Sequence, residues 1–218
     1  MLIDLKLDGK TVMVIGGGSE AYRKTQSALD SGAKIWVISR DFSEDMQRLE
    51  AEGKVALLKT EIKDAKAFVD SLNPKPDILL ATTDNSKLNL ELIKTAKSYG
   101  CMVYSVDNPV LSDFILPAVA HISDVKVAIS TGGRSPAMAR VLRERIEKFI
   151  TIQDLAEIDL QDELRRILKE RFSDPKVRRN LLFEILNNEA IKDALVEGKF
   201  DVAQQLSMKI IERGEIKE

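Results

Sequence analysis

Short apolar runs alternate with amphipathic stretches along the first half of the chain. Apolar runs bounded by turn residues predict strands, and here they cover Val12 to Ile15, Lys34 to Ser39, Val55 to Lys59, Ile78 to Ala81 and Met102 to Val106. The stretches between them have helical periodicity over about residues 19–31, 43–52, 64–72 and 86–99. Strands that alternate with helices pair in parallel through right-handed crossovers, so the pattern predicts an α/β fold with a Rossmann-like parallel sheet.

The pattern changes after Asp107. The segments Phe114 to Ala120 and Val125 to Ser130 resemble strands with no helix between them, which predicts a hairpin or an exchanged pair of strands at a dimer interface. Ser135 is a favoured N-cap and Pro136 a favoured first residue of the helix that follows. The predicted apolar face of this helix comprises Met138, Val141, Leu142, Ile146 and Phe149.

From about residue 151 the chain has helical periodicity throughout, with a break at Ser173 to Pro175 and two short helices around 189–197 and 200–212. This predicts a small packed helical module. We therefore expect a dinucleotide-binding domain over residues 1–113, a strand and helix dimerisation region over 114–150, and an all-helical C-terminal domain over 151–218.

A glycine-rich turn follows the first predicted strand and precedes the first predicted helix. Gly16, Gly18 and Ala21 occupy the three small-residue positions of the G-x-G-x-x-G/A dinucleotide-binding motif. A pyrophosphate would lie at the helix N-terminus, where unpaired backbone N–H groups and the helix dipole favour an anion. In a parallel sheet ligands bind beyond the carboxyl ends of the strands, so the loops starting at Gly16, Ser39, Thr82 and Asp107 should converge.

These positions predict a bound dinucleotide, and Glu20 and Arg40 complicate that prediction. Glu20 at the mouth of a phosphate site would repel a pyrophosphate unless its side chain turns outward. Arg40 stands where an acidic residue would bind the ribose of NAD and where an Arg accommodates the extra phosphate of NADP. The predicted cofactor-binding residues are Gly16, Gly17, Gly18, Ser19, Glu20, Ala21, Arg40, Asp41, Thr82 and Thr83.

The composition excludes several classes of protein. With 218 residues, 44% of them hydrophobic, the chain can form one sizeable core and an appended unit. A net charge of -2 argues against nucleic-acid binding through a generally basic surface, and no apolar run is long enough for a membrane helix. The single cysteine, Cys101, excludes an internal disulfide, and His121 stands without ligand-type neighbours, so no metal site is expected. The N-terminus has no signal-peptide layout, and we expect a cytoplasmic protein.

Four motifs together resemble the precorrin-2 dehydrogenases, a group that includes the dehydrogenase and ferrochelatase module of sirohaem synthases. The resemblance covers roughly residues 1–150, and its most specific part is the run from Ser130 to Pro136. The motifs are Gly16 to Lys24, Ala81 to Asn85 with Leu88 and Asn89, Val106 to Pro109 with Asp113 to Pro117, and Ala128 to Pro136 with Ala139 and Arg140.

The resemblance implies NAD-dependent oxidation of precorrin-2 to sirohydrochlorin by an intertwined homodimer, with ferrous or cobaltous ion as a further substrate in relatives that also insert metal. It aligns Asp107 with the family's proposed catalytic aspartate. Loss of a hydride from a tetrapyrrole requires loss of a proton, and metal insertion requires two pyrrole protons to leave, so a carboxylate can serve either step. The alternative reading is that Asp107 only caps the turn at Asn108 and Pro109.

The tetrapyrrole substrate carries eight carboxylates, so its binding surface should present cations and backbone N–H groups. Arg pairs with a carboxylate through two parallel hydrogen bonds, and helix N-termini attract anions. Arg134 and Arg140 can supply the cations, and the alternative for both is a solvated basic face on an ordinary helix. The predicted substrate-binding residues are Thr131, Gly133, Arg134, Ser135 and Arg140.

Two other functions fit the same motifs. A dinucleotide-sensing regulatory module would need the Gly16 turn but neither Asp107 nor Arg134. The chain could instead be a tetrapyrrole-binding chelatase or carrier that has lost the redox step, and Glu20 in the glycine turn would agree with that loss.

Overall fold

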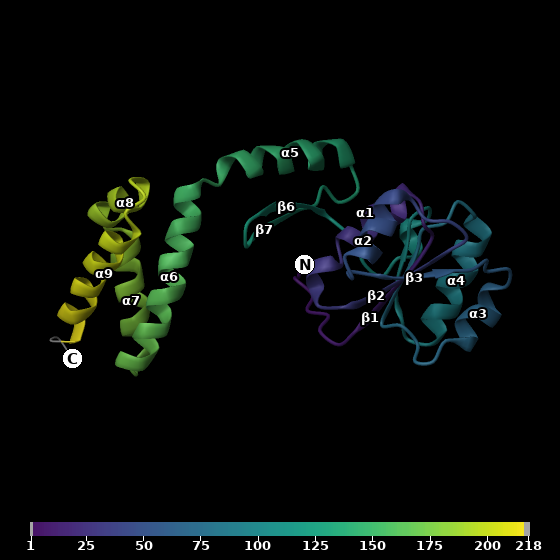
Figure 1. Ribbon diagram of the computed structural model, residues 1–218, viewed down its shortest axis with the longest axis horizontal. Coiled ribbons are helices and arrows are strands. Elements are labelled where there is room, and N and C mark those ends of the chain that lie inside the picture. The colour runs from purple at the N-terminus through teal and green to yellow at the C-terminus, as the bar shows by residue number, and fades with distance from the viewer. Residues whose placement is uncertain (1, 216–218) are drawn as a thin grey trace. The chain divides into compact units, whose positions relative to one another are not determined.

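The computed structural model describes residues 2–215 and divides into two compact units, Met1–Leu116 and Pro117–Glu218 (Figure 1). The boundary between the units falls three residues after the predicted boundary at residue 113. The further division of the second unit at residue 150 stays a prediction.

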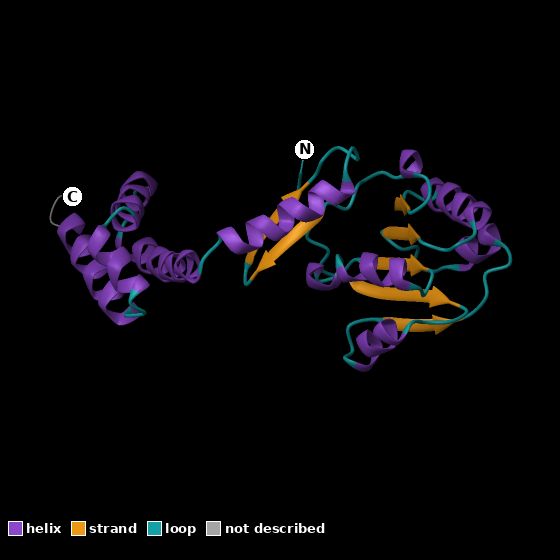
Figure 2. Cartoon of the chain, turned by 90° about the horizontal axis from the view of Figure 1, so that it is seen from above, coloured by secondary structure: helices purple, strands orange, loops and turns teal. Residues whose placement is uncertain are grey.

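The first unit contains a five-stranded parallel sheet with the strand order β3-β2-β1-β4-β5 (Figure 2). All five predicted strands are present, and their bounds differ from the predicted ones by at most one residue. The strands are β1 Thr11–Ile15, β2 Lys34–Ser39, β3 Ala56–Lys59, β4 Ile78–Ala81 and β5 Met102–Ser105. The strand order reverses between β1 and β4, and this is the position where ligands bind in open α/β sheets.

Helices cover both faces of the sheet, and the alternation of side chains along β1 shows why. Met13 and Ile15 enter one apolar cluster together with α3 and α4, whereas Val12 and Val14 enter the other together with α1 and α2. The four helices are α1 Ser19–Gln26, α2 Glu44–Ala51, α3 Ala65–Ser71 and α4 Ser86–Ser98.

The helix predicted over residues 19–31 is interrupted. The helix α1 ends at Gln26, and a short 3-10 turn, η1 Leu29–Ser31, leads to Gly32. Gly32 has a φ of 77°, a left-handed conformation that favours glycine and ends the segment where the sequence predicted.

The second unit begins with an antiparallel hairpin, β6 Ala118–Ile122 and β7 Val125–Ile129. The prediction of a strand beginning at Phe114 was wrong, because residues 114–117 are not in a strand. Phe114 instead packs against Tyr104 of β5, with the ring centroids 6.0 Å apart, and the Pro117 that follows has no N–H to donate to a strand ladder.

The helix α5, Pro136–Phe149, packs against both strands of the hairpin (Figure 2). The predicted cap is confirmed, because Ser135 Oγ accepts a hydrogen bond from the Met138 N–H over 3.2 Å. Several apolar side chains of this helix are exposed: Phe149 is 78% exposed, Met138 45% and Val141 37%.

The predicted helical module consists of α6 Ile152–Arg171, α7 Pro175–Leu186, α8 Glu189–Val196 and α9 Phe200–Glu215. These helices pack around their own apolar core, which includes Leu164, Leu168, Phe172 and Ile185. A reciprocal capping box between Thr151 and Asp154 starts α6. The module therefore has its own core, separate from the two clusters that flank the parallel sheet.

Candidate functional site

The glycine turn between β1 and α1 is held from both sides by the neighbouring loops. Gly16 has a φ of 127°, and a Cβ on it would lie 2.7 Å from Thr82 Oγ1 and 2.8 Å from Thr82 O. A Cβ on Gly17 would overlap the Asp41 carbonyl oxygen. Both glycines are buried, so residues with side chains do not fit at these two positions.

Backbone hydrogen bonds bring three of the predicted loops together. The Gly16 N–H donates to Ile38 O at 2.8 Å, and the Ser43 N–H donates to Gly17 O at 2.9 Å. On the other side, the Thr82 hydroxyl donates to Ile15 O at 2.8 Å. The predicted convergence of the loops at Gly16, Ser39 and Thr82 is confirmed by these contacts.

The start of α1 is open to a ligand. Gly18 is the N-cap residue, no side chain caps the helix, and a Cβ on Gly18 would meet no atom within 4 Å. Gly18 and Ser19 are exposed, whereas Ala21 is buried against the sheet. An uncapped helix start beside an open glycine fits a pyrophosphate group, because the first N–H groups of the helix have no partner within it.

Glu20 turns away from the helix start and toward the next turn of α1. Its carboxylate lies 2.7 Å from the Arg23 guanidinium and 3.7 Å from Lys24 Nζ. Two cations therefore offset the negative charge that a pyrophosphate would meet. Lys24 is buried and lies 4.7 Å from the centroid of the Tyr104 ring, so it packs against the sheet as well as pairing locally.

Arg40 and Asp41 follow β2 and are both exposed. Arg40 lies 3.9 Å from Glu61, and Asp41 lies 3.3 Å from Lys59. Exposed pairs of this kind are weak, so neither side chain is held strongly in place.

Asp107 follows β5, and the Ser105 hydroxyl donates a hydrogen bond to its Oδ1 over 2.8 Å. The polar side chains of Ser86 and Asn89 also favour the charged form of this carboxylate. Burial raises the pKa of this carboxyl, but the polar groups of Ser86, Ser105 and Asn89 outweigh that effect and hold its pKa below the usual range. Asp107 is therefore ionised at neutral pH and accessible to solvent.

Asn89 of α4 binds Thr83, which follows β4, and also helps to lower the pKa of Asp107. Its side chain is fully buried; its Oδ1 accepts from the Thr83 hydroxyl at 2.7 Å, and its Nδ2 donates to Thr83 O at 3.0 Å. A buried amide with both ends bonded fixes the geometry of its partners. The sequence places Asn89 in a motif but assigns it no role, and it likewise assigns none to Ser86 or Ser105.

The loop after Asp107 is tied back to β5. Ser112 Oγ accepts from the Ser105 N–H at 2.9 Å, and Asp113 Oδ2 accepts from the Val103 N–H at 2.9 Å. Asp113 also pairs with Lys97 at 2.6 Å. Burial raises the pKa of the Asp113 carboxyl, but Lys97 and the Val103 N–H together hold its pKa below the usual range. Asp113 thus has a structural role here.

The turn before α5 contains the predicted substrate-binding residues. Gly132 and Gly133 have φ values of 61° and 78°, and Thr131 Oγ1 accepts a hydrogen bond from the Ser135 N–H at 3.1 Å. Arg134 is exposed, and Arg140 pairs with Glu144 at 2.9 Å while its side chain remains 77% exposed. All of these contacts join residues of the second unit.

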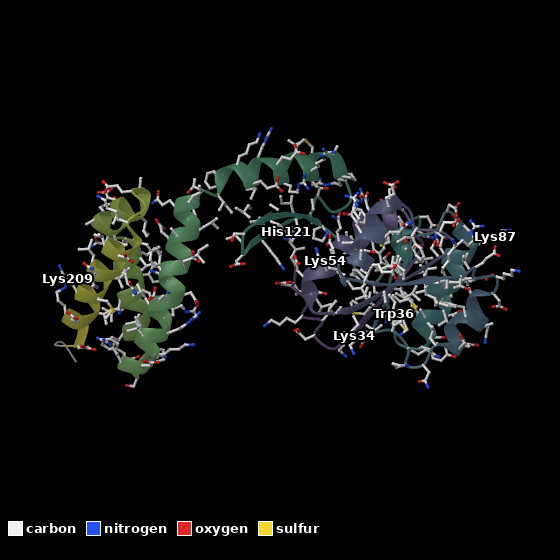
Figure 3. The ribbon with its side chains drawn as sticks, viewed as in Figure 1. Lys34, Trp36, Lys54, Lys87, His121 and Lys209 are labelled. Atoms are coloured by element: carbon white, nitrogen blue, oxygen red, sulfur yellow. The ribbon has the colours of Figure 1, made fainter. Side chains whose placement is uncertain are left out.

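The described residues were also compared with the predictions that the chain has no metal site and no membrane helix. Among residues 2–215, no three side chains of His, Cys, Asp or Glu lie close enough together to hold a metal ion. His121 lies on β6 of the hairpin (Figure 3). No helix in the same range is both long and apolar enough to cross a membrane.

Comparison with known proteins places this site in a family. A family model described as "Putative NAD(P)-binding" matches residues 3–118, more than half of the chain, and a second, described as "Sirohaem biosynthesis protein central", matches residues 124–148. The chain belongs to this NAD(P)-binding family. The two matches together confirm the resemblance that the four sequence motifs indicated.

Siroheme synthases are among the curated proteins that the chain resembles. The chain is 32% identical over 202 residues to siroheme synthase 1 of Aeromonas salmonicida and 33% identical over 207 residues to the siroheme synthase of Methylococcus capsulatus. These alignments cover 93% and 95% of the chain but only 42% of each relative. The chain thus spans less than half the length of the curated relatives that it matches.

The fold is shared with a solved structure titled "SirC, precorrin-2 dehydrogenase". The TM-score is 0.73 at 24% sequence identity, and the match covers 96% of this chain and 99% of the other. The match extends through the helical module, which the motif resemblance did not cover. It confirms the predicted succession of a parallel sheet, a small antiparallel sheet and C-terminal helices.

Proposed function

We propose that the chain is a precorrin-2 dehydrogenase that oxidises precorrin-2 to sirohydrochlorin with NAD. The observation that carries the proposal is the ionised, accessible Asp107 at the same edge of the sheet as the open glycine turn. Neither a dinucleotide sensor nor a simple carrier needs a carboxylate held in its charged form at that edge. Family membership and the fold match are consistent with this activity.

The residues at the glycine turn fit a nicotinamide dinucleotide. Gly18 leaves room for the pyrophosphate, the N–H groups at the start of α1 would bind it, and Thr82 and Thr83 border the same edge. When bound, the nicotinamide accepts the hydride that leaves the tetrapyrrole. NAD is proposed on the family resemblance, and the exposed Arg40 is the residue through which NADP would bind instead.

In the proposed reaction Asp107 takes up the proton that must leave the tetrapyrrole as the hydride departs. Its lowered pKa keeps the carboxylate ionised and therefore free to take up a proton, and the hydrogen bond from Ser105 fixes its position. The same carboxylate would accept pyrrole protons if ferrous or cobaltous ion is inserted afterwards.

The exposed apolar face of α5 and the basic turn before it complete the proposal. Met138, Val141 and Phe149 would be covered in a homodimer, since clustered large apolar side chains are costly to leave in water. The substrate carboxylates would bind Arg134, Arg140 and the N–H groups near Gly133 and Ser135.

The cytoplasm is the proposed compartment, because Cys101 is a buried free thiol and the cofactor is a nicotinamide.

One experiment separates the dehydrogenase from its two rivals. Precorrin-2 is supplied anaerobically with NAD or with NADP, reduced nicotinamide is followed by absorbance, and ferrous or cobaltous ion is then added. The dehydrogenase forms one reduced nicotinamide per precorrin-2 oxidised. A regulatory module or a carrier forms none with either cofactor, and a chelatase without redox activity changes the tetrapyrrole spectrum only when metal is added to sirohydrochlorin.

A further inference from the structure

A pocket of about 400 Å³ lies between α6 and α7 in the helical module. Leu168, Leu182, Leu186 and Phe183 contribute apolar walls, and Gln161 donates a hydrogen bond across to Leu182 O at 3.3 Å. The volume falls within the range of small-molecule sites, which is about 300 to 1,000 Å³. The proposed dehydrogenase reaction does not use this pocket.

The pocket is lined by four cations and by no carboxylate: Arg165, Lys169, Arg178 and Arg179. The surrounding module has the opposite balance, because residues 151–215 contain eleven Lys and Arg against fourteen Asp and Glu. Within residues 2–215, no acidic group lies within 4 Å of any of these four cations. The cations are therefore gathered around an apolar surface without the ion pairs that other basic residues of the module form.

Two of the cations are held in place by the protein itself. The Arg178 guanidinium donates to the carbonyl oxygens of Phe172 and Ser173 at 2.7 and 2.8 Å, where α6 ends. The Arg179 guanidinium lies over the half-exposed Phe183 ring, 5.6 Å from its centroid. An Arg that stacks on an aromatic ring keeps its N–H groups available in the plane of the guanidinium.

We infer that this pocket is a second binding site for a polycarboxylate tetrapyrrole, one that holds the reaction product. Such a ligand has a flat apolar body bearing carboxylates at its edge, which matches apolar walls ringed by guanidinium and ammonium groups. The choice of ligand rests on the proposed dehydrogenase function. The cationic and apolar character of the pocket follows from its lining residues alone. The helical module then contributes product retention, a role separate from oxidation.

The test uses uroporphyrin I, an octacarboxylate porphyrin that cannot donate the hydride of precorrin-2. Titration of the full chain, followed by porphyrin fluorescence, should show two equivalents per chain, one at the dehydrogenase site and one at the pocket. The double variant Arg165→Ala/Arg179→Ala should lose one equivalent and keep the initial rate of precorrin-2 oxidation. Two matched controls lie on the same module outside the pocket: Arg166→Ala on α6 and Lys209→Ala on α9 (Figure 3). Both should bind as the wild type does.

The inference is overturned if the double variant and Arg166→Ala give superimposable titrations, because the pocket then contributes no bound equivalent. Circular dichroism of each variant establishes that the helices are intact. A failure of the proposed dehydrogenase function is recognised separately, because it appears as absence of reduced nicotinamide in the wild type, whereas the equivalent lost in the double variant does not depend on turnover.

Discussion

The Ser105 hydroxyl donates a hydrogen bond to Asp107 Oδ1 over 2.8 Å. Ser105 is buried at the end of β5, and Asp107 lies two residues later in solvent. The strand therefore fixes the donor, and the donor fixes the carboxylate and favours its charged form. The arrangement links the end of one strand to the ionisation of one side chain.

Ser105→Ala should shift the pH dependence of precorrin-2 oxidation. Loss of the donor raises the pKa of Asp107, so the fall in rate on the acid side should move to higher pH by about half a pH unit to one pH unit. The rate near pH 8 should change little, because the carboxylate remains ionised there. The measurement is kcat/KM from about pH 3 to 8, a range that includes the acid limb of a carboxyl with a lowered pKa, with Ser98→Ala on α4 as the control. An unshifted profile would remove Ser105 from the positioning of Asp107.

Two glycines of the turn should respond differently to alanine. Gly16→Ala places a Cβ at 2.7 Å from Thr82 Oγ1 at a positive φ, so it should lower the free energy of unfolding by about 1 to 3 kcal/mol. Gly18→Ala has room for its Cβ and should keep its stability, yet it should weaken dinucleotide binding about tenfold or more because the methyl group occupies the space for the pyrophosphate.

The two glycine variants can be measured with one reporter. Trp36 is the only tryptophan and lies on β2, three residues before the strand ends (Figure 3). Its fluorescence can follow both urea unfolding and quenching by the dinucleotide. An equal loss of stability in both variants would contradict the different steric environments of Gly16 and Gly18. Unchanged cofactor affinity in Gly18→Ala would contradict the placement of the pyrophosphate at Gly18.

Arg40→Leu should separate the two candidate cofactors. The Arg40 side chain is exposed and only weakly paired with Glu61, so it is available to an adenosine phosphate. Its removal should weaken NADP binding about tenfold and leave NAD binding nearly unchanged. Arg48→Leu on α2 is the control for loss of a surface charge. If the affinities for NAD and for NADP fall equally, Arg40 does not bind the adenosine phosphate of NADP.

Val141→Glu should convert the proposed homodimer into a monomer. Val141 lies on the exposed apolar face of α5, and an unpaired carboxylate buried in an interface costs several kcal/mol. Light scattering after size-exclusion chromatography at micromolar concentration measures the mass directly. Lys148→Glu on the same helix should stay dimeric. A dimer that persists in Val141→Glu would place the interface elsewhere.

Much of the fold could be predicted because periodicity and turn residues act locally. The five strands and the cap at Ser135 depend on apolar runs and on short-range hydrogen bonds, and both are visible in the sequence. The strand that was placed from Phe114 could not be predicted correctly, because Phe114 is apolar but packs on Tyr104, ten residues earlier in the chain. Apolar character alone does not distinguish a strand from a packed loop.

The candidate site could be predicted only in part for a similar reason. Gly16, Gly18 and Asp107 stand at recognisable positions relative to strands. The effect of Glu20 depends on where its side chain points, and the structure places it beside Arg23 and Lys24. The role of Asn89 depends on two partners from separate loops, and such a buried connection has no local sequence pattern.

The central claim is that Asp107 accepts the proton released as precorrin-2 is oxidised. The most direct measurement is the anaerobic rate of reduced nicotinamide formation from precorrin-2 in the wild type, in Asp107→Asn and in Asp84→Asn, a nearby exposed carboxylate after β4. Asp107→Asn should retain dinucleotide binding, and its kcat should fall by a factor of about 10² to 10⁴. Asp84→Asn should have the same kcat as the wild type. Unchanged turnover in Asp107→Asn would contradict the account.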